Sequence, residues 1–269
     1  MTPPPRLHVV TATDCATAVV LRRGPSTQVA SILWDRASNK IELGQWLHGR
    51  IHEYRTDLSP DGKHLVYFAC RAGRCWTVVS RAPWLRAIAY WPQPSSWHGG
   101  GAFTDRGALW LNGAEPPANL PDGLRSAATD AFPHSTDGFH MGGLFATMMR
   151  RRGWSHVAGE GYDIELQRPV TDGWTLQMRF SVGESDRALI STRYALCAAD
   201  GAQVIDMPGW EWADLRGDVL QWAEKGALWQ ARPGRGGGLE DRALLHDFSD
   251  MTFEAVDAPY QGIQERPDQ

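Results

Sequence analysis

The hydrophobic and polar positions of this chain predict many short β-strands separated by turns. Apolar and β-branched residues gather in runs of six to eight positions, and turn-forming residues such as Gly, Pro, Ser and Asn separate them. The clearest runs cover residues 16–22, 28–35 and 40–47, and then residues 65–70, 75–81 and 85–91. Each series of three is typical of a meander of antiparallel strands.

The clearest turn lies in the stretch from Thr56 to Phe68, which reads Thr-Asp-Leu-Ser-Pro-Asp-Gly-Lys-His-Leu-Val-Tyr-Phe. Residues 59–62 predict a tight β-turn, because Pro60 presets φ, Asp61 can bond its own backbone and Gly62 accepts a positive φ. The apolar run that follows, residues 65–68, lacks polar alternation. It therefore predicts a strand that is covered on both faces.

Weaker copies of this stretch recur along the chain. Ala102 lies 45 residues after Asp57, in a segment that again has small residues, an Asp-x-Gly turn and an apolar strand. Further copies or strand sets cover residues 97–111, 162–168, 174–182, 188–198 and 212–222. A repeat of about 40 to 50 residues built from short strands is typical of propeller blades.

We therefore expect an all-β fold, a β-propeller of about five blades forming a single domain over residues 1–269. A large β-sandwich of about 15 strands is the alternative architecture. Closure of a propeller commonly pairs strands from both termini in one blade, and residues 242–248 and 252–256 are the candidates for the C-terminal share.

The stretch from Thr56 to Phe68 resembles the WD40-like repeat of TolB-type β-propellers, whose blades carry a Ser-Pro-Asp-Gly turn followed by an apolar strand. The resemblance covers about one inner hairpin of a blade. It implies the propeller fold and carries over no functional residue. The chain as a whole also resembles uncharacterised bacterial proteins, which implies no function.

One segment, residues 113–153, interrupts the regular pattern. It begins with a Pro-rich loop that cannot continue a sheet. Toward its end, residues 142–152 predict a short helix with three arginines in its last turn and a stop at Gly153. We expect an irregular and helical insertion on the propeller.

Composition and charge narrow the function classes. The chain has 269 residues, of which 42% are hydrophobic and 22% charged, with a formal net charge of −4. Nucleic-acid binders usually carry a basic patch, so we expect no nucleic-acid partner. Thirteen tryptophans favour a large aromatic core, and a platform for stacking sugars or bases is the alternative.

The sequence suggests a cytoplasmic protein. No secretory signal is visible and no run of about 18 apolar residues occurs, so no membrane association is expected. Four cysteines are too few for a disulfide scaffold. Cys70 and Cys75 could face each other across a hairpin, but we expect reduced thiols.

Candidate contact residues come from two places. His98 precedes three glycines, which either let a ligand approach the backbone or relieve crowding, and we favour crowding. The insertion supplies the other candidates, which are His134, Asp137, His140, Arg150 and Arg151. The histidine spacing matches no familiar zinc motif, so we expect no metal and no cofactor. The arginines could simply stabilise the helix, because cations at a helix C-terminus interact favourably with the helix dipole.

No catalytic motif occurs in the chain. There is no nucleophile elbow, no phosphate-binding loop and no metalloprotease motif. We therefore expect a noncatalytic binding or protein-interaction module, with the insertion as the contact element. The alternative is a small-molecule hydrolase or lyase, glycosidase-like, with its site at the propeller channel. Residues of that alternative near the expected inner strands are His52, Glu53, Asp57, Asp163, Glu165, Glu211 and Asp214.

Overall fold

The computed structural model describes residues 3–24, 27–115, 119–133, 141–170, 173–185 and 188–261. Its backbone divides into two compact units. Unit 1 comprises Met1–His8 and Phe139–Met251, and unit 2 comprises Val9–Gly138 and Thr252–Gln269. The assignment of residues 1–269 to a single domain stays a prediction.

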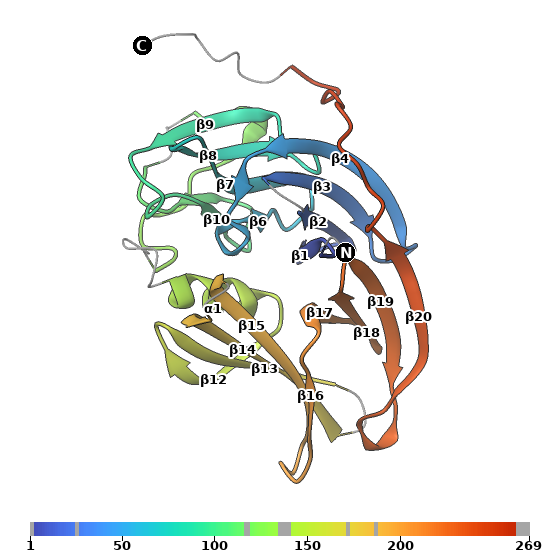
Figure 1. The fold of residues 1–269 in the computed structure, drawn as a ribbon. Coiled ribbons are helices and arrows are strands. Elements are labelled where there is room, and N and C mark those ends of the chain that lie inside the picture. The colour runs from blue at the N-terminus through green and yellow to red at the C-terminus, as the bar shows by residue number, and fades with distance from the viewer. Residues whose placement is uncertain are drawn as a thin grey trace. The chain divides into compact units, whose positions relative to one another are not determined.

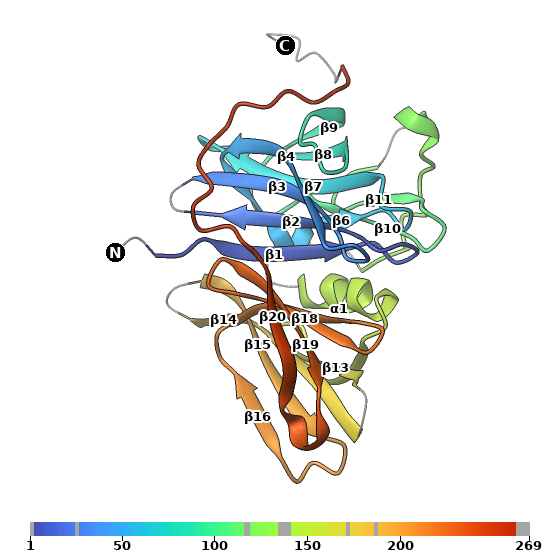
Figure 2. The same ribbon diagram turned by 90° about the vertical axis from the view of Figure 1, so that its right-hand side faces the viewer.

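Unit 2 is built from two antiparallel sheets and one hairpin (Figures 1 and 2). The first sheet runs in chain order through β1 (Arg6–Thr11), β2 (Thr17–Arg23), β3 (Gln28–Asp35) and β4 (Lys40–His48), and the unit boundary falls within β1. The second sheet contains β5 (Arg50–Ile51), β6 (Asp57–Leu58), β7 (His64–Arg71), β8 (Arg74–Arg81) and β9 (Ala87–Gln93). The hairpin consists of β10 (Gly101–Phe103) and β11 (Leu109–Leu111), and two short 3-10 helices are η1 (Glu53–Arg55) and η2 (Pro121–Gly123).

Strand β7 is the centre of unit 2, because apolar clusters cover both of its faces. Leu65 and Tyr67 belong to a cluster with residues of the first sheet, including Val19. Val66 belongs to a second cluster with Phe103 of the hairpin. The sequence prediction of a strand covered on both faces is confirmed. Because both faces of β7 are buried, consecutive positions are apolar instead of alternating with polar ones.

Unit 1 contains two antiparallel sheets and the α-helix. One sheet runs through β12 (Ser155–Glu160), β13 (Asp163–Pro169), β14 (Trp174–Ser185), β15 (Ala188–Ala198) and β16 (Val204–Met207). The other runs through β17 (Trp210–Arg216), β18 (Val219–Glu224), β19 (Ala227–Pro233) and β20 (Leu239–Asp247), with η4 (Arg235–Gly237) before the last strand.

Helix α1 (Met141–Arg151) begins and ends one residue before the predicted helix of residues 142–152, and the predicted stop at Gly153 follows it. Gly153 has a φ of +84°, and its N–H bonds to the carbonyl of Arg150 while the N–H of Trp154 bonds to that of Met149. This pair of bonds is a Schellman motif, which needs glycine at the left-handed position. Phe145 of the helix stacks on Phe180 of β14 at 4.8 Å, so the apolar face of the helix covers the sheet.

The prediction of an all-β propeller fold is confirmed, with one correction to the blade number. The strands form four blade-sized antiparallel meanders rather than about five. The unit expected around residues 97–111 is only a hairpin of two three-residue strands. After β11 the chain turns at Asn112 and Gly113 and enters the Pro-rich loop, and the described residues between β11 and α1 add no further strand to the hairpin.

Two further expectations are wrong. Strand β20 pairs with β19 inside its own sheet and residues 252–256 form no strand, so the segments expected to share a blade with the N-terminus do not. Cys70 and Cys75 form a disulfide instead of remaining reduced. The register explains it, because the two residues lie directly opposite each other in β7 and β8 with Cα atoms 4.1 Å apart.

The tryptophans mainly supply core area, as expected. Seven of the thirteen are buried, and Trp97 alone is classed as exposed, at 44%. Trp210 stacks on Trp222 at 5.0 Å between neighbouring strands of unit 1. Most of the indole surface is therefore used in packing rather than offered to a ligand.

Candidate functional site

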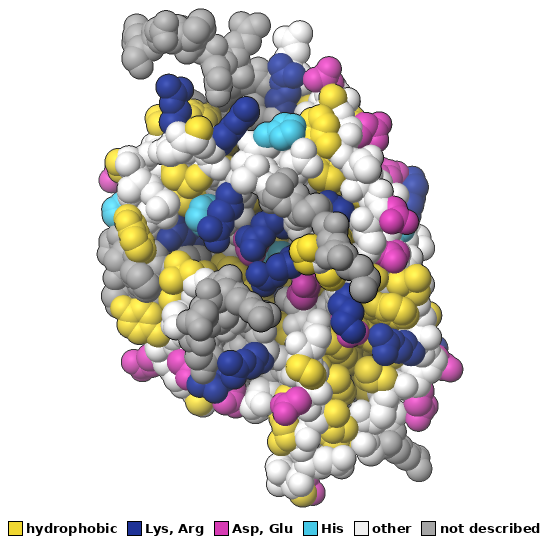
Figure 3. All heavy atoms as spheres, in the orientation of Figure 1, with side chains coloured by type: hydrophobic (Ala, Val, Ile, Leu, Met, Phe, Trp, Pro, Cys, Tyr) yellow, Lys and Arg dark blue, Asp and Glu magenta, His cyan; other side chains and the backbone are white. Residues whose placement is uncertain are grey.

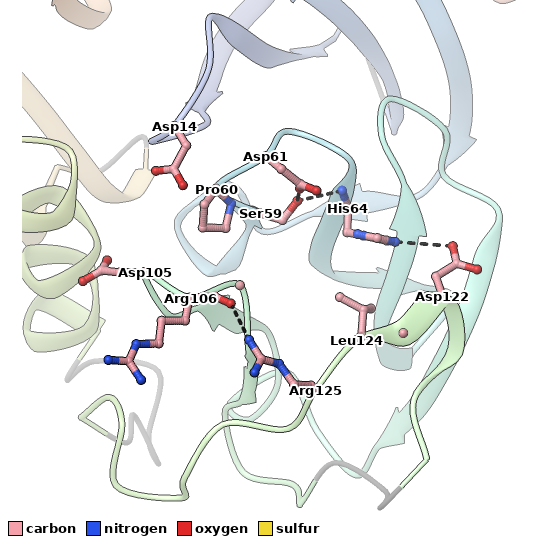
Figure 4. A pocket seen from close by; sticks show the side chains of 12 residues that line it. Asp14, Ser59, Pro60, Asp61, His64, Asp105, Arg106, Asp122, Leu124 and Arg125 are labelled. Carbon is pink, nitrogen blue, oxygen red and sulfur yellow. Dashed lines mark hydrogen bonds and ion pairs between the residues drawn. The ribbon is translucent and has the colours of Figure 1, made fainter.

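The predicted turn at residues 59–62 forms one wall of a polar pocket of about 440 Å³ in unit 2. We call it the turn pocket (Figure 4). Its other walls are the turn between β10 and β11, the segment around η2, and Asp14 in the loop between β1 and β2. Segments from four places in the sequence thus meet at the pocket.

The turn at residues 59–62 is held by a buried serine. The Ser59 hydroxyl donates to Asp61 Oδ1 at 2.7 Å and accepts the backbone N–H groups of Lys63 and His64 at 3.1 and 2.9 Å. Gly62 adopts a φ of +74°, and a Cβ there would lie 2.8 Å from Thr17 Cβ. Glycine is therefore required both by the turn and by the approach of the neighbouring strand.

The turn at residues 104–107 repeats this arrangement on the hairpin. The N–H of Gly107 bonds to the carbonyl of Thr104 at 2.8 Å, as the N–H of Gly62 bonds to that of Ser59 at 2.8 Å. The Thr104 hydroxyl accepts the N–H of Ala108 at 3.0 Å, which is the role that Ser59 has in the first turn. The two copies found in the sequence are thus structurally equivalent turns that line one pocket.

Asp122 of η2 joins the second sheet to the pocket. Its carboxylate accepts two hydrogen bonds from the Arg81 guanidinium at 2.6 and 2.7 Å, and Oδ2 lies 3.3 Å from His64 Nε2. The hydrogen bonds from Arg81, and then the one from His64, lower the pKa of Asp122 to about 2, against the opposing effect of burial. Leu120 and Leu124 flank η2 and pack against the cluster around Val66, so the segment is anchored on both sides.

A pH dependence follows from Asp122. Because its folded pKa is below the unfolded value of about 3.8, its contribution to stability is present above pH 4 and is lost as the pH falls toward 2. We expect the Asp122→Asn variant to be less stable than the wild type by about 1 kcal/mol at pH 6, since Arg81 is half-exposed and solvent screens the pair. The gap should narrow steeply between pH 4 and pH 2. Urea unfolding of both proteins between pH 2 and pH 7 measures it, and a gap independent of pH would contradict the assignment.

Acidic groups outnumber basic groups around the turn pocket. Its lining includes four aspartates, two arginines and His64. Although burial alone would raise it, hydrogen bonds from Ser59 and Lys63 lower the pKa of Asp61. The Arg125 guanidinium donates to the carbonyl of Arg106 at 3.1 Å, across from the aspartates. At neutral pH the pocket therefore presents mainly ionised carboxylates, with a basic edge.

The residues proposed from sequence do not line this pocket. His98 lies in the loop before β10 instead of within a strand, and its carbonyl accepts a hydrogen bond from Arg55 at 3.2 Å. Arg150 lies near the end of α1 and donates to Thr147 at 3.0 Å, and Arg151 is its neighbour in unit 1. His134, Asp137 and His140 lie outside the described residues. Among the described residues no cluster of three His, Cys, Asp or Glu side chains could hold a metal ion.

The carboxylates proposed for a channel enzyme form hydrogen bonds or ion pairs within the protein. Asp57 accepts the N–H of Phe103, Asp163 pairs with Arg179, and Asp214 pairs with Arg168. Glu53 pairs with Arg23, Glu211 accepts the N–H of Leu7, and Glu165 accepts from Gln177. Burial is the largest cause that lowers the pKa of His52 to about 4, so this histidine is neutral at pH 7.

The repeated Asp-containing turn is a sequence signal that could have located the turn pocket, although it is taken above only as evidence for the fold. The two Asp-containing turns occupy matching positions in successive repeats, so they emerge at the same edge of neighbouring sheets. Carboxylates on equivalent turns therefore come together. Asp122 had no such signal, because its position depends on the path of the Pro-rich loop.

No protein-family model matches the chain, and no curated protein sequence matches it. Among solved structures, it is similar to the β-propeller domain of the trilobed protease from Pyrococcus furiosus, at 8% identity and a TM-score of 0.35, over 92% of this chain and all of that one. Hydrazine synthase from Kuenenia stuttgartiensis has 9% identity and a TM-score of 0.37, over 86% of this chain and 77% of that one. The uncharacterised protein lmo1340 from Listeria monocytogenes has 9% identity and a TM-score of 0.33, over 89% of this chain and 66% of that one. At identities this low, the activities of those proteins are not assigned to this chain.

Proposed function

We propose that this protein is a noncatalytic binding module that contacts a protein partner through the turn pocket. The observation that carries the proposal is that the side chains in the pocket best suited to catalysis are already committed to structural bonds. Ser59 is fully used by its own turn. His64 faces Asp122, which Arg81 holds as an ion pair.

A hydrolase would need these groups in another state. A serine nucleophile must reach the substrate, whereas Ser59 is only 2% exposed and its oxygen already accepts two backbone N–H groups. A histidine base must reach the substrate, whereas the His64 side chain is only 11% exposed and faces Asp122, whose charge Arg81 already pairs. The arrangement supports recognition of a ligand by fixed charges instead.

The charge of the turn pocket indicates what part of a partner it would accept. Carboxylates of Asp14, Asp61 and Asp105 come from three different loops and surround the same space (Figure 4). Their negative charge would attract a lysine or arginine side chain of a partner, and Arg125 lies at the rim where it could contact an acidic neighbour. We therefore propose a basic segment of a partner protein as the ligand. Part of the insertion, the segment around η2, belongs to this contact surface.

Electrostatics elsewhere agree with a protein partner more than with a nucleic acid. On the face drawn in Figure 3, basic and acidic side chains are interspersed. Nucleic-acid recognition instead favours a continuous basic surface. In the described part of the chain no helix is long and apolar enough to cross a membrane.

Peptide display against the intact protein tests the proposal. We expect selected peptides to be enriched in Lys and Arg, and to bind the Asp61→Asn/Asp105→Asn variant at least about tenfold more weakly, as expected for the loss of charge-assisted bonds. The matched control is Asp218→Asn/Asp250→Asn, which removes two exposed aspartates of unit 1. Selected peptides that bind both variants equally would contradict the proposed site.

The competing enzyme function is tested in parallel with glycosides, esters and phosphoesters as substrates. Turnover that disappears in His98→Ala or in Asp137→Asn, with folding retained, would favour the hydrolase or lyase. Absence of peptide selection together with such turnover would overturn the binding module.

The family and the location remain proposals. The Ser-Pro-Asp-Gly turn, now placed between β6 and β7, supports a WD40-like propeller of the TolB type. A bacterial, cytoplasmic setting stays a prediction. The disulfide between Cys70 and Cys75 weakens the cytoplasmic part of it, because disulfides persist mainly in oxidising compartments.

A further inference from the structure

A second pocket, of about 480 Å³, opens in unit 2 at the hairpin end of β7 and β8. Its walls are Thr27 before β3, His48 at the end of β4, Arg50 of β5, and Cys70 and Arg71 of β7. We call it the cationic pocket. None of its lining residues belongs to the turn pocket.

All the charged side chains that line the cationic pocket are basic. Arg50 and Arg71 are exposed, His48 is beside them, and the lining contains no carboxylate. Other arginines of this chain are neutralised by ion pairs, such as Arg81 with Asp122. Among the described residues Arg50 and Arg71 have no such carboxylate partner, although the protein as a whole carries a net charge of −4.

The hairpin end concentrates positive charge further. Arg71 lies directly opposite Arg74 in the register of β7 and β8. Like charges at opposed positions of an antiparallel pair destabilise it. The adjoining pair, Cys70 and Cys75, is locked by the disulfide, so the two arginines are held near each other. A bound anion would remove this repulsion.

The half-buried His52, two residues after Arg50, is affected by the positive charges of this region. His52 follows β5, and burial is the largest cause of its lowered pKa of about 4. The positive charges of Arg50, Arg55 and Arg23 lower it further, and the Glu53 carboxylate acts in the opposite direction. Glu53 is itself paired with Arg23 at 3.2 Å and does not line the pocket.

We propose that the cationic pocket binds a small-molecule anion through its phosphate or carboxylate group, held by the guanidinium groups of Arg50 and Arg71. Guanidinium groups form paired, charge-assisted hydrogen bonds with both kinds of anion. The volume of the pocket falls within the range of sites for small molecules, about 300 to 1,000 Å³. This site goes beyond the proposed protein-binding function and does not depend on it.

Isothermal titration calorimetry of the intact, oxidised protein tests the inference with three probes, which are inorganic phosphate, pyrophosphate and citrate. We expect saturable binding of at least one probe, and its identity distinguishes phosphate from carboxylate recognition. Arg50→Gln and Arg71→Gln should each weaken binding by about tenfold or more, as expected for loss of a charged hydrogen-bond donor. Arg71→Lys should weaken it less, because the charge remains while the paired geometry is lost.

The matched control is Arg216→Gln, which removes an exposed arginine of unit 1 and should leave the affinity unchanged. Since Arg50 and Arg71 are exposed, all variants should fold, and thermal unfolding checks this. Failure of all three probes to saturate would overturn the inference. Equal affinities of wild type, Arg50→Gln and Arg71→Gln would also overturn it, since binding would then lie elsewhere.

Discussion

Replacement of Asp57 with alanine should lower the free energy of unfolding of unit 2 by about 3 kcal/mol or more, because it removes a buried carboxyl group that satisfies two backbone donors. The Asp57 side chain is fully buried. Its carboxylate accepts the N–H of Leu58 at 3.0 Å and the N–H of Phe103 at 2.8 Å. Alanine would leave both N–H groups buried without these acceptors.

Asp57 matters because it links the two repeats that build the turn pocket. It belongs to β6, just before the turn at residues 59–62, and Phe103 ends β10, just before the turn at residues 104–107. The bond between them therefore sets the spacing of the two turns. Loss of this bond should loosen the pocket as well as the core.

Urea unfolding followed by tryptophan fluorescence measures the loss of stability. Asp57→Asn keeps one acceptor oxygen and should lie between wild type and Asp57→Ala, whereas Asp250→Ala, at an exposed position, should stay within about 0.5 kcal/mol of wild type. Hydrogen exchange of the Phe103 amide gives a local measurement. An unchanged exchange rate in Asp57→Ala would show that the bond does not hold β10.

The sequence was sufficient for elements with strong local signals. The strands around residues 28–35 and 40–47 appear as β3 and β4 within one residue, because apolar runs and turn residues mark both ends. Strand β1 is not predicted, because residues 12–16 contain neither Gly nor Pro and no turn signal separates β1 from β2. Strand β12 is exposed along its whole length and has no apolar pattern to detect.

The remaining features depend on contacts between distant segments. Spacing alone permits Cys70 and Cys75 to be free or bonded, and only the register of β7 against β8 decides. Asp122 meets Arg81, 41 residues earlier, because Leu120 and Leu124 anchor the Pro-rich loop on the core. A sequence shows that a loop carries a charged residue such as Asp122, but the path of the backbone determines which residue pairs with it.

Substitution of a glycine after His98 is the second change for which we expect a large loss of stability. Gly100 has a φ of +85°, and a Cβ added there would lie 2.6 Å from Arg55 Cβ and 2.7 Å from the Arg55 carbonyl oxygen. Arg55 is buried, so neither atom can move away at low cost. Gly100→Ala should therefore destabilise the protein by about 3 to 5 kcal/mol, from backbone strain and overpacking together.

Gly107→Ala is the matched control, because Gly107 has a similar φ of +72° but no atom within 4 Å of an added Cβ. It should cost only about 1 to 2 kcal/mol, the strain of a left-handed alanine. The difference between the two variants in urea unfolding isolates the close approach at Gly100. A large difference means that Gly100, in the glycine run after His98, relieves crowding against Arg55. Equal losses would mean that the approach is not a packing constraint, and the glycines would then again be candidates for a ligand-facing surface.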